Sequence, residues 1–269
     1  MTINEKNAVN ADVTALGTKL NILVFTAHPD DHVPCVGTLL KLNQLGFELY
    51  ECLFTNGEAS GLFANGTYTS AIDPVNLTQV RSDEFKCASK LLGTKEVFLL
   101  NQPNLGIQKS VELYKTIVGI IRKVKPFIVF MHGPNDYNED HTMVYEICQM
   151  ALRMTANPQF LELGPRFRVP IVLCFDGLFL SNPSILVDIS DVLSDKEKVS
   201  DCYKSQMPKD SMGYKVEGAI STYRGYQRSV VNKLGKSGQA SEGFTVPEKF
   251  PIAADELFDL FSKLKAKNE

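Results

Sequence analysis

Apolar runs alternate with amphipathic stretches along most of this chain, and that alternation is typical of a parallel sheet covered by helices. The first apolar run, residues 20–26, predicts a buried strand. Further strands are predicted at residues 48–54, 97–100, 126–131, 170–175 and 184–189. Helices are predicted at residues 36–45, 77–92, 111–124, 142–154, 191–206 and 219–231. This order predicts an α/β, Rossmann-like, three-layer fold with a mostly parallel sheet flanked by helices.

Segments rich in Gly, Asn, Ser and Thr interrupt this pattern at residues 56–74 and 232–247, and both are predicted to be loops. A loop as long as 56–74 is usually functional or mobile in a compact domain. Residues 256–265 predict a closing helix. We interpret the polar segment 1–19 as a flexible leader and residues 20–269 as a single α/β domain.

Composition and charge narrow the class of protein. The 269 residues are 44% hydrophobic and 22% charged, which is ordinary for a globular protein. The net charge of −3 gives no electrostatic argument for binding nucleic acid or an anionic membrane surface. No apolar run approaches the roughly 20 residues that span a bilayer, and segment 1–19 lacks the pattern of a signal peptide. We therefore expect a cytoplasmic protein with no nucleic-acid partner and no membrane span.

The six cysteines are widely spaced, form no CxxC pair and mostly lie in apolar stretches. This pattern favours buried free thiols in a reducing compartment over disulfides or a cysteine zinc site.

Candidate chemistry is concentrated directly after the first predicted strand, where residues 27–32 read AHPDDH. The chain has only four histidines, and all of them lie in two segments that follow the predicted strands 20–26 and 126–131; they are His28, His32, His132 and His141. Open α/β sheets bind ligands outside the carboxyl ends of their strands. Both segments are therefore expected on the same rim of the sheet.

These residue types predict a metal site. Histidine nitrogen and aspartate oxygen suit zinc, and a catalytic zinc site takes about three protein ligands. His28 and Asp31 are close enough in a turn to converge on one ion, and His141 is the third candidate ligand. Asp30 then stays free as a candidate general base. Asp140 is expected to orient neighbouring groups. Taken alone, an Asp-Asp pair is usually a solvated turn or a helix cap, but the clustering of the histidines favours the metal site.

The chain resembles the PIG-L/LmbE family of zinc-dependent deacetylases that act on N-acetylglucosamine-type groups. That family carries an AHPDDE turn, matched here by AHPDDH at residues 27–32, and a later H-x(3)-D-x-H-P-D-H segment, matched by HGPNDYNEDH at residues 132–141. Weaker matches occur at residues 55–58, 81–84 with 91–93, 198 with 205–206, and 240–244. The resemblance covers roughly residues 20–245.

The resemblance implies amide hydrolysis, in which a zinc-activated water attacks an acetamide carbonyl and releases acetate and a free amine. It implies that Asp30 is the general base, that Arg81 and Glu58 contact the substrate, and that zinc is held by His28, Asp31 and His141. Other divalent ions also suit such a site. The implied partner is a small N-acetylated sugar or its conjugate. Family members often form homo-oligomers, so self-association is an expectation as well.

The chain departs from the family motifs at three positions. His32 replaces the glutamate of the first motif, Asn138 replaces a histidine thought to stabilise the oxyanion or donate a proton, and Asn104 replaces an aspartate near the sugar site. Asparagine donates a hydrogen bond but cannot act as an acid. Tyr137, His32 and His132 are candidates to supply the missing group.

Plainer alternatives stay open for several of these residues. His132 could be a structural imidazole, His32 an exposed residue at a helix start and Tyr137 a packing residue. Arg81 could be a surface ion-pair partner and Glu58 a solvated loop charge. Alternative functions are an amidase or esterase with the same metal, or a metal-binding or sugar-binding protein that has lost catalysis. A nucleotide-binding Rossmann domain is disfavoured because no G-x-G-x-x-G follows the first strand.

Overall fold

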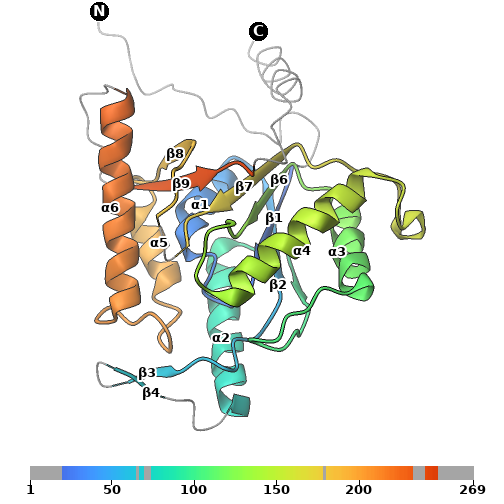
Figure 1. The fold of residues 1–269 in the computed structure, drawn as a ribbon. Helices are drawn as coiled ribbons and strands as arrows, with labels where there is room; N and C mark the ends of the chain where they lie inside the picture. The colour runs from blue at the N-terminus through green and yellow to red at the C-terminus, as the bar shows by residue number, and fades with distance from the viewer. Residues whose placement is uncertain (1–19, 65–66, 70–73, 178–179, 233–239, 248–269) are drawn as a thin grey trace, which may run out of the picture.

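A mixed seven-stranded sheet forms the central layer of the computed structural model, which describes residues 20–64, 67–69, 74–177, 180–232 and 240–247. The strand order is β5-β2-β1-β6-β7-β9-β8 (Figure 1). The strands are β1 (Asn21–Thr26), β2 (Glu48–Leu53), β5 (Glu96–Leu99), β6 (Ile128–Met131), β7 (Ile171–Phe175), β8 (Ile185–Asp188) and β9 (Ser241–Thr245). All pairings from β5 to β7 are parallel, and β9 runs antiparallel to both β7 and β8.

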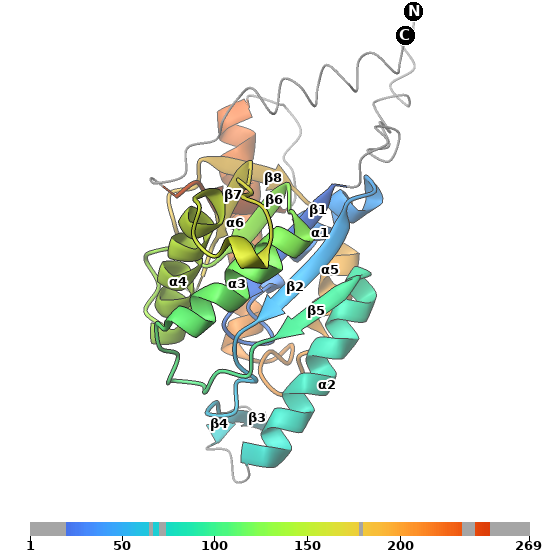
Figure 2. The ribbon, with the colours of Figure 1, turned by 90° about the vertical axis from the view of Figure 1, so that its right-hand side faces the viewer.

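Helices cover both faces of this sheet. One face is covered by α3 (Val111–Val124) and α4 (Glu139–Ala156), which pack against each other (Figures 1 and 2). The other face is covered by α1 (Val36–Gln44), α2 (Pro74–Leu92) and α5 (Leu193–Ser200), with α6 (Met212–Asn232) packed against β8 and β9. Short 3-10 turns are η3 (Val33–Cys35) and η4 (Leu161–Leu163). The predicted three-layer α/β fold with a mostly parallel sheet is confirmed.

The alternating burial of strand residues explains why the sheet carries two separate cores. Leu23 and Phe25 of β1 pack into the core beneath α3 and α4. Ile22 and Val24 of the same strand point to the opposite face, into the core beneath α1, α2 and α5. All four side chains are fully buried, because successive side chains of a strand alternate between faces and both faces are covered. Strand β1 ends at Thr26, so the turn at residues 27–32 lies at the carboxyl edge of the sheet.

The structure corrects several predicted boundaries. The predicted loop 232–247 contains strand β9, which pairs with neighbours on both sides although its sequence SEGFT is poor in strand-forming residues. The predicted loop 56–74 contains the hairpin strands β3 (Leu62–Ala64) and β4 (Thr67–Thr69). Helix α5 ends at residue 200, earlier than the predicted residue 206. Helix α6 begins at residue 212 and not at 219, because it includes glycines that the sequence pattern treats as helix breakers. Segments 1–19 and 256–265 lie outside the described residues.

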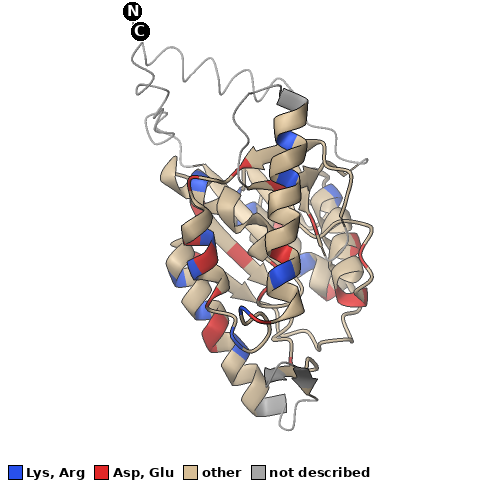
Figure 3. Cartoon of the chain, turned by 90° about the vertical axis from the view of Figure 1, so that its left-hand side faces the viewer, with Lys and Arg blue, Asp and Glu red and all other residues tan. Residues whose placement is uncertain are grey.

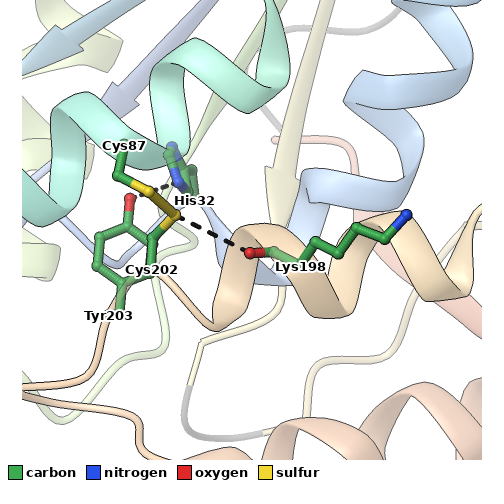
Figure 4. Close-up of a disulfide and its surroundings, with 5 residues drawn as sticks. All are labelled: His32, Cys87, Lys198, Cys202 and Tyr203. Carbon is green, nitrogen blue, oxygen red and sulfur yellow. Dashed lines mark hydrogen bonds between the residues drawn. A yellow bond between two sulfur atoms is a disulfide. The ribbon is translucent and has the colours of Figure 1, made fainter.

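The prediction of free thiols is wrong for one pair of cysteines. Cys87 of α2 and Cys202, directly after α5, form a disulfide between Cα atoms 5.9 Å apart (Figure 4). Helices α2 and α5 pack against each other, so residues separated by 115 positions in the chain come within disulfide reach. The remaining cysteines are buried free thiols, as predicted; they are Cys35, Cys52, Cys148 and Cys174.

Charges of both signs are interspersed over the helices on the side of the molecule that carries α6 (Figure 3). Within the described part of the chain, every helix is too short or too polar to cross a bilayer.

Candidate metal centre and active site

Two rim segments meet at the carboxyl edge of the sheet because β1 and β6 are adjacent parallel strands. His28 lies in the turn after β1, and His132 lies directly after β6. His141 belongs to the first turn of α4, which begins at residue 139. The sheet topology therefore brings these two distant segments together, as predicted.

Three side chains converge at this point with their donor atoms facing one another. His28 Nδ1 lies 3.1 Å from His141 Nε2 and 3.3 Å from Asp31 Oδ2. His141 Nε2 lies 3.1 Å from Asp31 Oδ1. The side chains are at most 9% exposed. The three residues expected to hold the metal thus form a compact group that could bind an ion.

A carboxylate orients each of the two imidazoles through its second nitrogen. His28 Nε2 lies 3.2 Å from Asp140 Oδ2, and His141 Nδ1 lies 2.9 Å from Asp136 Oδ2. These contacts leave His28 Nδ1 and His141 Nε2 to face the shared space. Carboxylates in this position fix the tautomer and raise the basicity of a ligating imidazole. Asp140 was expected to play such a part, whereas Asp136 was not among the candidate residues, although it occupies the aspartate position of the second motif.

The charges in this group shift its pKa values strongly. Burial opposes protonation of His28, but Asp31 and Asp140 outweigh it and raise the pKa of His28 to about 9. Burial is likewise outweighed at His141, whose pKa is raised to about 10 by Asp31 and Asp136. The same imidazoles hold the pKa of Asp31 well below its ordinary value despite its burial. The protein alone thus places protons where a cation would sit, which is the electrostatic setting of a metal site.

Asn104 and Glu58, both expected to contact substrate, belong to a hydrogen-bond network around Asp140, the carboxylate next to His28. The amide of Asn104 donates to Asp140 Oδ2 at 2.7 Å and lies 3.1 Å from His28 Nε2. Glu58 accepts a 2.7 Å hydrogen bond from the backbone of Asn104. The backbone N–H of Leu105 also donates to Asp140 Oδ2, at 2.8 Å. These contacts hold the carboxylate that orients His28.

His132 is buried and stacks on His141 with ring centroids 4.0 Å apart. Its Nε2 accepts a 3.1 Å hydrogen bond from the backbone N–H of Ala27 and lies 3.2 Å from Asp31 Oδ2. Burial and the positive charge of His141 lower the pKa of His132 to about 4, so its ring is neutral at physiological pH. His132 is therefore a buried, neutral ring that packs beside the metal group.

The structure places Asn138 at the N-cap of α4. Its side-chain oxygen accepts hydrogen bonds from the backbone N–H groups of Asp140 at 2.9 Å and of His141 at 3.4 Å. The amide that replaces the family histidine therefore fixes the helix start that carries His141. The neighbouring Tyr137 is 63% exposed and does not line the cavity beside the metal group.

Asp30 forms an ion pair with Arg81 of α2. The Arg81 guanidinium is nearly fully buried and also donates to the carbonyl of Gly57 at 3.1 Å and to Ser60 Oγ at 2.5 Å. The interpretation of Arg81 as a surface ion-pair partner is therefore wrong, because the guanidinium is buried and its partner Asp30 is only partly exposed. Asp30 and Asp31 both line a cavity of about 200 Å³ beside the metal group.

His32 is fully buried, which excludes the interpretation as an exposed helix-start residue. Its Nδ1 lies 2.5 Å from Glu51 Oε1, and its Nε2 lies 2.7 Å from the hydroxyl of Tyr203 (Figure 4). Both nitrogens are thus held by buried partners that the sequence did not reveal. The replacement of the family glutamate by His32 is accommodated inside the fold and gives this ring no access to the cavity.

The weaker motif matches correspond to buried contacts between elements. Glu84 of α2 accepts hydrogen bonds from the backbone and hydroxyl of Ser205, both at 2.7 Å. Glu242 of β9 accepts from the backbone of α1 and pairs with Lys196 Nζ at 2.8 Å. Lys196 is the buried lysine of α5, whereas Lys198, selected from the sequence, is exposed and pairs with a neighbouring aspartate.

An α/β sheet that carries a His-Asp-His group at its carboxyl edge is the framework of a candidate metal-dependent enzyme. Residues 23–152 match the PIG-L family, described as GlcNAc-PI de-N-acetylase. The chain is similar to diacetylchitobiose deacetylase of Thermococcus kodakarensis, with 27% identity over 221 residues that cover 77% of this chain and 80% of the relative. These findings confirm the predicted resemblance to the PIG-L/LmbE family.

Two solved structures share the fold. N,N'-diacetylchitobiose deacetylase from Pyrococcus horikoshii is 24% identical, with a TM-score of 0.71 and coverage of 92% of this chain and 94% of the other. GalB, the 4-carboxy-2-hydroxymuconate hydratase from Pseudomonas putida KT2440, is 21% identical, with a TM-score of 0.72 and coverage of 84% and 95%. Because proteins named for different reactions share this fold, the chemistry has to be argued from the site.

Proposed function

We propose that this protein is a zinc-dependent N-deacetylase that removes an acetyl group from a small N-acetylated amino sugar or its conjugate. The observation that carries the proposal is the convergence of His28, Asp31 and His141 at 3.1–3.3 Å beside a cavity. The deacetylases among the relatives supply the reaction class.

The spacing and chemistry of the three donors fit zinc. Ligands at about 2.0–2.1 Å in a tetrahedral site are separated by about 3.3 Å, close to the 3.1 Å that separates His141 Nε2 from His28 Nδ1 and from Asp31 Oδ1. Two imidazole nitrogens and one carboxylate oxygen are a suitable donor set, and both imidazoles have an orienting carboxylate. When bound, zinc polarises a carbonyl and lowers the pKa of a coordinated water to about 7.

Asp30 is the candidate general base, because its carboxylate lines the cavity next to Asp31 without belonging to the three-residue group. Its ion pair with Arg81 holds the carboxylate in one orientation. The proposed part of Arg81 is therefore to position the base. Glu58, Asn104 and Asp140 position His28 in the same indirect way.

The test is Asp30→Asn in zinc-loaded protein. We expect zinc content to remain at the wild-type level and acetate release from N-acetylglucosamine derivatives to fall by two or more orders of magnitude, the usual contribution of a positioned base. Asp83→Asn is the matched control, because Asp83 is an exposed carboxylate on α2 that is paired with Lys86. Full activity of Asp30→Asn would remove Asp30 as the base.

A screen of acetamides, other conjugates and esters separates the proposed deacetylase from an amidase or esterase with the same metal. Asn138→His tests the third alternative, a protein that has lost catalysis. A large gain in turnover would identify a weakened enzyme. An unchanged high rate would show that the cap formed by Asn138 is sufficient and that another group stabilises the oxyanion.

A further inference from the structure

The cavity beside the metal group has two chemically different walls. Asp30, Asp31 and His141 line its polar wall. The rest of the lining is mainly apolar and comes from η3, the segment after α5 and one face of α6, through Val33, Pro34, Met207, Val216 and Ile220; we call this part the apolar wall. Val216 and Ile220 are four residues apart, so they lie side by side on the same face of α6.

The charged side chains next to this apolar wall form ion pairs inside the protein. Glu217, which also lines the cavity, pairs with the buried Lys196 at 2.8 Å. Asp176 is held by the fully buried Arg224 through two contacts of 2.8 and 2.9 Å. The carboxylates next to α6 are therefore engaged by internal cations, and Val216 and Ile220 give this helix a mainly apolar surface toward the cavity.

We infer that this apolar wall is an acyl-chain subsite, which binds the N-acyl group of the substrate and accepts linear chains longer than acetyl. The inference rests on the proposed function, because it takes the amide carbonyl to lie at the group formed by His28, Asp31 and His141. It names the part of the substrate that faces α6 and the residues that select it, chiefly Val216 and Ile220.

The chemistry of the two substituents of an amide decides which one enters the cavity. An acyl chain can be buried against apolar side chains without losing hydrogen bonds, whereas sugar hydroxyls would lose theirs. A larger groove of about 870 Å³ adjoins the cavity, shares Phe175 and Gly177 with it, and carries polar side chains that include Asn135, Gln149 and Asn182. The sugar accordingly lies toward this groove and the acyl group toward α6.

The size of the cavity sets the length of the chain. A volume of about 200 Å³ corresponds to roughly seven water-sized groups at about 30 Å³ each. The acetyl group occupies about three of them, so about four further carbon atoms fit before the cavity is full. Each added methylene that becomes buried is expected to raise affinity by about fourfold, up to that limit.

The experiment measures two properties of zinc-loaded, full-length protein. The first is the binding of acetate, propionate and butyrate by calorimetry, which needs no turnover. The second is kcat/KM for N-acetyl-, N-propionyl- and N-butyrylglucosamine. Val216→Phe fills the apolar wall, and Val230→Phe is the matched control, because Val230 is 60% exposed on the same helix and does not line the cavity.

Wild-type protein and Val230→Phe are expected to bind butyrate up to about fifteenfold more tightly than acetate, and Val216→Phe is expected to bind the two equally. The same change should appear in the butyryl-to-acetyl ratio of kcat/KM. Equal binding of all three carboxylates by wild-type protein, or an unchanged preference in Val216→Phe, overturns the subsite. A chain-length preference that depends on Val216, with no hydrolysis of any N-acyl sugar, supports the subsite and overturns only the proposed reaction.

Discussion

Replacing Asp136 by asparagine should weaken metal binding although Asp136 is not one of the three proposed ligands. Its Oδ2 lies 2.9 Å from His141 Nδ1, and its Oδ1 accepts a 3.0 Å hydrogen bond from the backbone of Asn138. Asparagine has one carbonyl oxygen for these two contacts. If that oxygen stays with Asn138, the amide NH₂ faces His141 Nδ1 and favours the tautomer protonated on Nε2, the atom that faces Asp31 and His28.

The expected magnitude follows from the burial of the contact. The Asp136 side chain is only 3% exposed, so solvent screens little of its interaction with His141. Removing a carboxylate that orients a ligating histidine costs about 10–100-fold in metal affinity, which corresponds to about 1.4–2.8 kcal/mol. Because asparagine also promotes the unfavourable tautomer, we expect a loss near the upper end of that range.

Zinc affinity of the purified variants would be measured by competition with a chromophoric chelator, with circular dichroism as the test of folding. Asp188→Asn is the control. Asp188 Oδ1 accepts a 3.0 Å hydrogen bond from the backbone of Ser190, which is the same local turn, and its other oxygen pairs with Arg228 away from the metal group. The reasoning is refuted if folded Asp136→Asn binds zinc within twofold of wild type.

Three further outcomes are expected. The pKa values of His28 and His141 are raised to about 9 and 10, so both rings are protonated at neutral pH. Metal affinity should therefore rise as the pH approaches 9. Calorimetry in buffers of different ionisation enthalpy should detect proton release on metal binding, and its absence would contradict the assigned protonation. Cys87→Ser opens a disulfide that spans 115 residues and should lower the free energy of unfolding by about 4–5 kcal/mol. Thiol titration of the unreduced, denatured wild type tests the disulfide itself and should find four thiols and not six. Arg224→Met removes the arginine that pairs with the buried carboxylate of Asp176 and should lower the free energy of unfolding, measured by urea denaturation, by about 3–5 kcal/mol. A loss below about 1 kcal/mol would show that the pair is not important for stability.

The core of the sheet and the metal group were predictable because they depend on local patterns and on the rim that neighbouring parallel strands share. The strands β1, β6 and β7 are largely apolar runs, whereas β2 also carries Glu48 and Glu51, and each of the four was placed within a few residues of its observed bounds. His28 and Asp31 lie together in one short turn, so their proximity is a local property. His141 was found because the carboxyl ends of neighbouring parallel strands form one rim.

Residues whose roles depend on partners far along the chain were not predictable in the same way. Strand β9 forms because β7 and β8 offer it hydrogen-bonding edges. The ring of His32 is held by Glu51 and Tyr203, which lie 19 and 171 positions away in the chain. The disulfide between Cys87 and Cys202 likewise depends on the packing of α2 against α5.

The sequence by itself determined the layered α/β architecture and the donor types of the proposed metal centre, because hydrophobic periodicity and short motifs act over a few neighbouring residues. Only the tertiary structure decided which carboxylate orients each imidazole, that Asn138 caps α4, and which residues of α6 face the cavity. These properties depend on distances between side chains that separate elements bring together, and a linear pattern does not contain those distances.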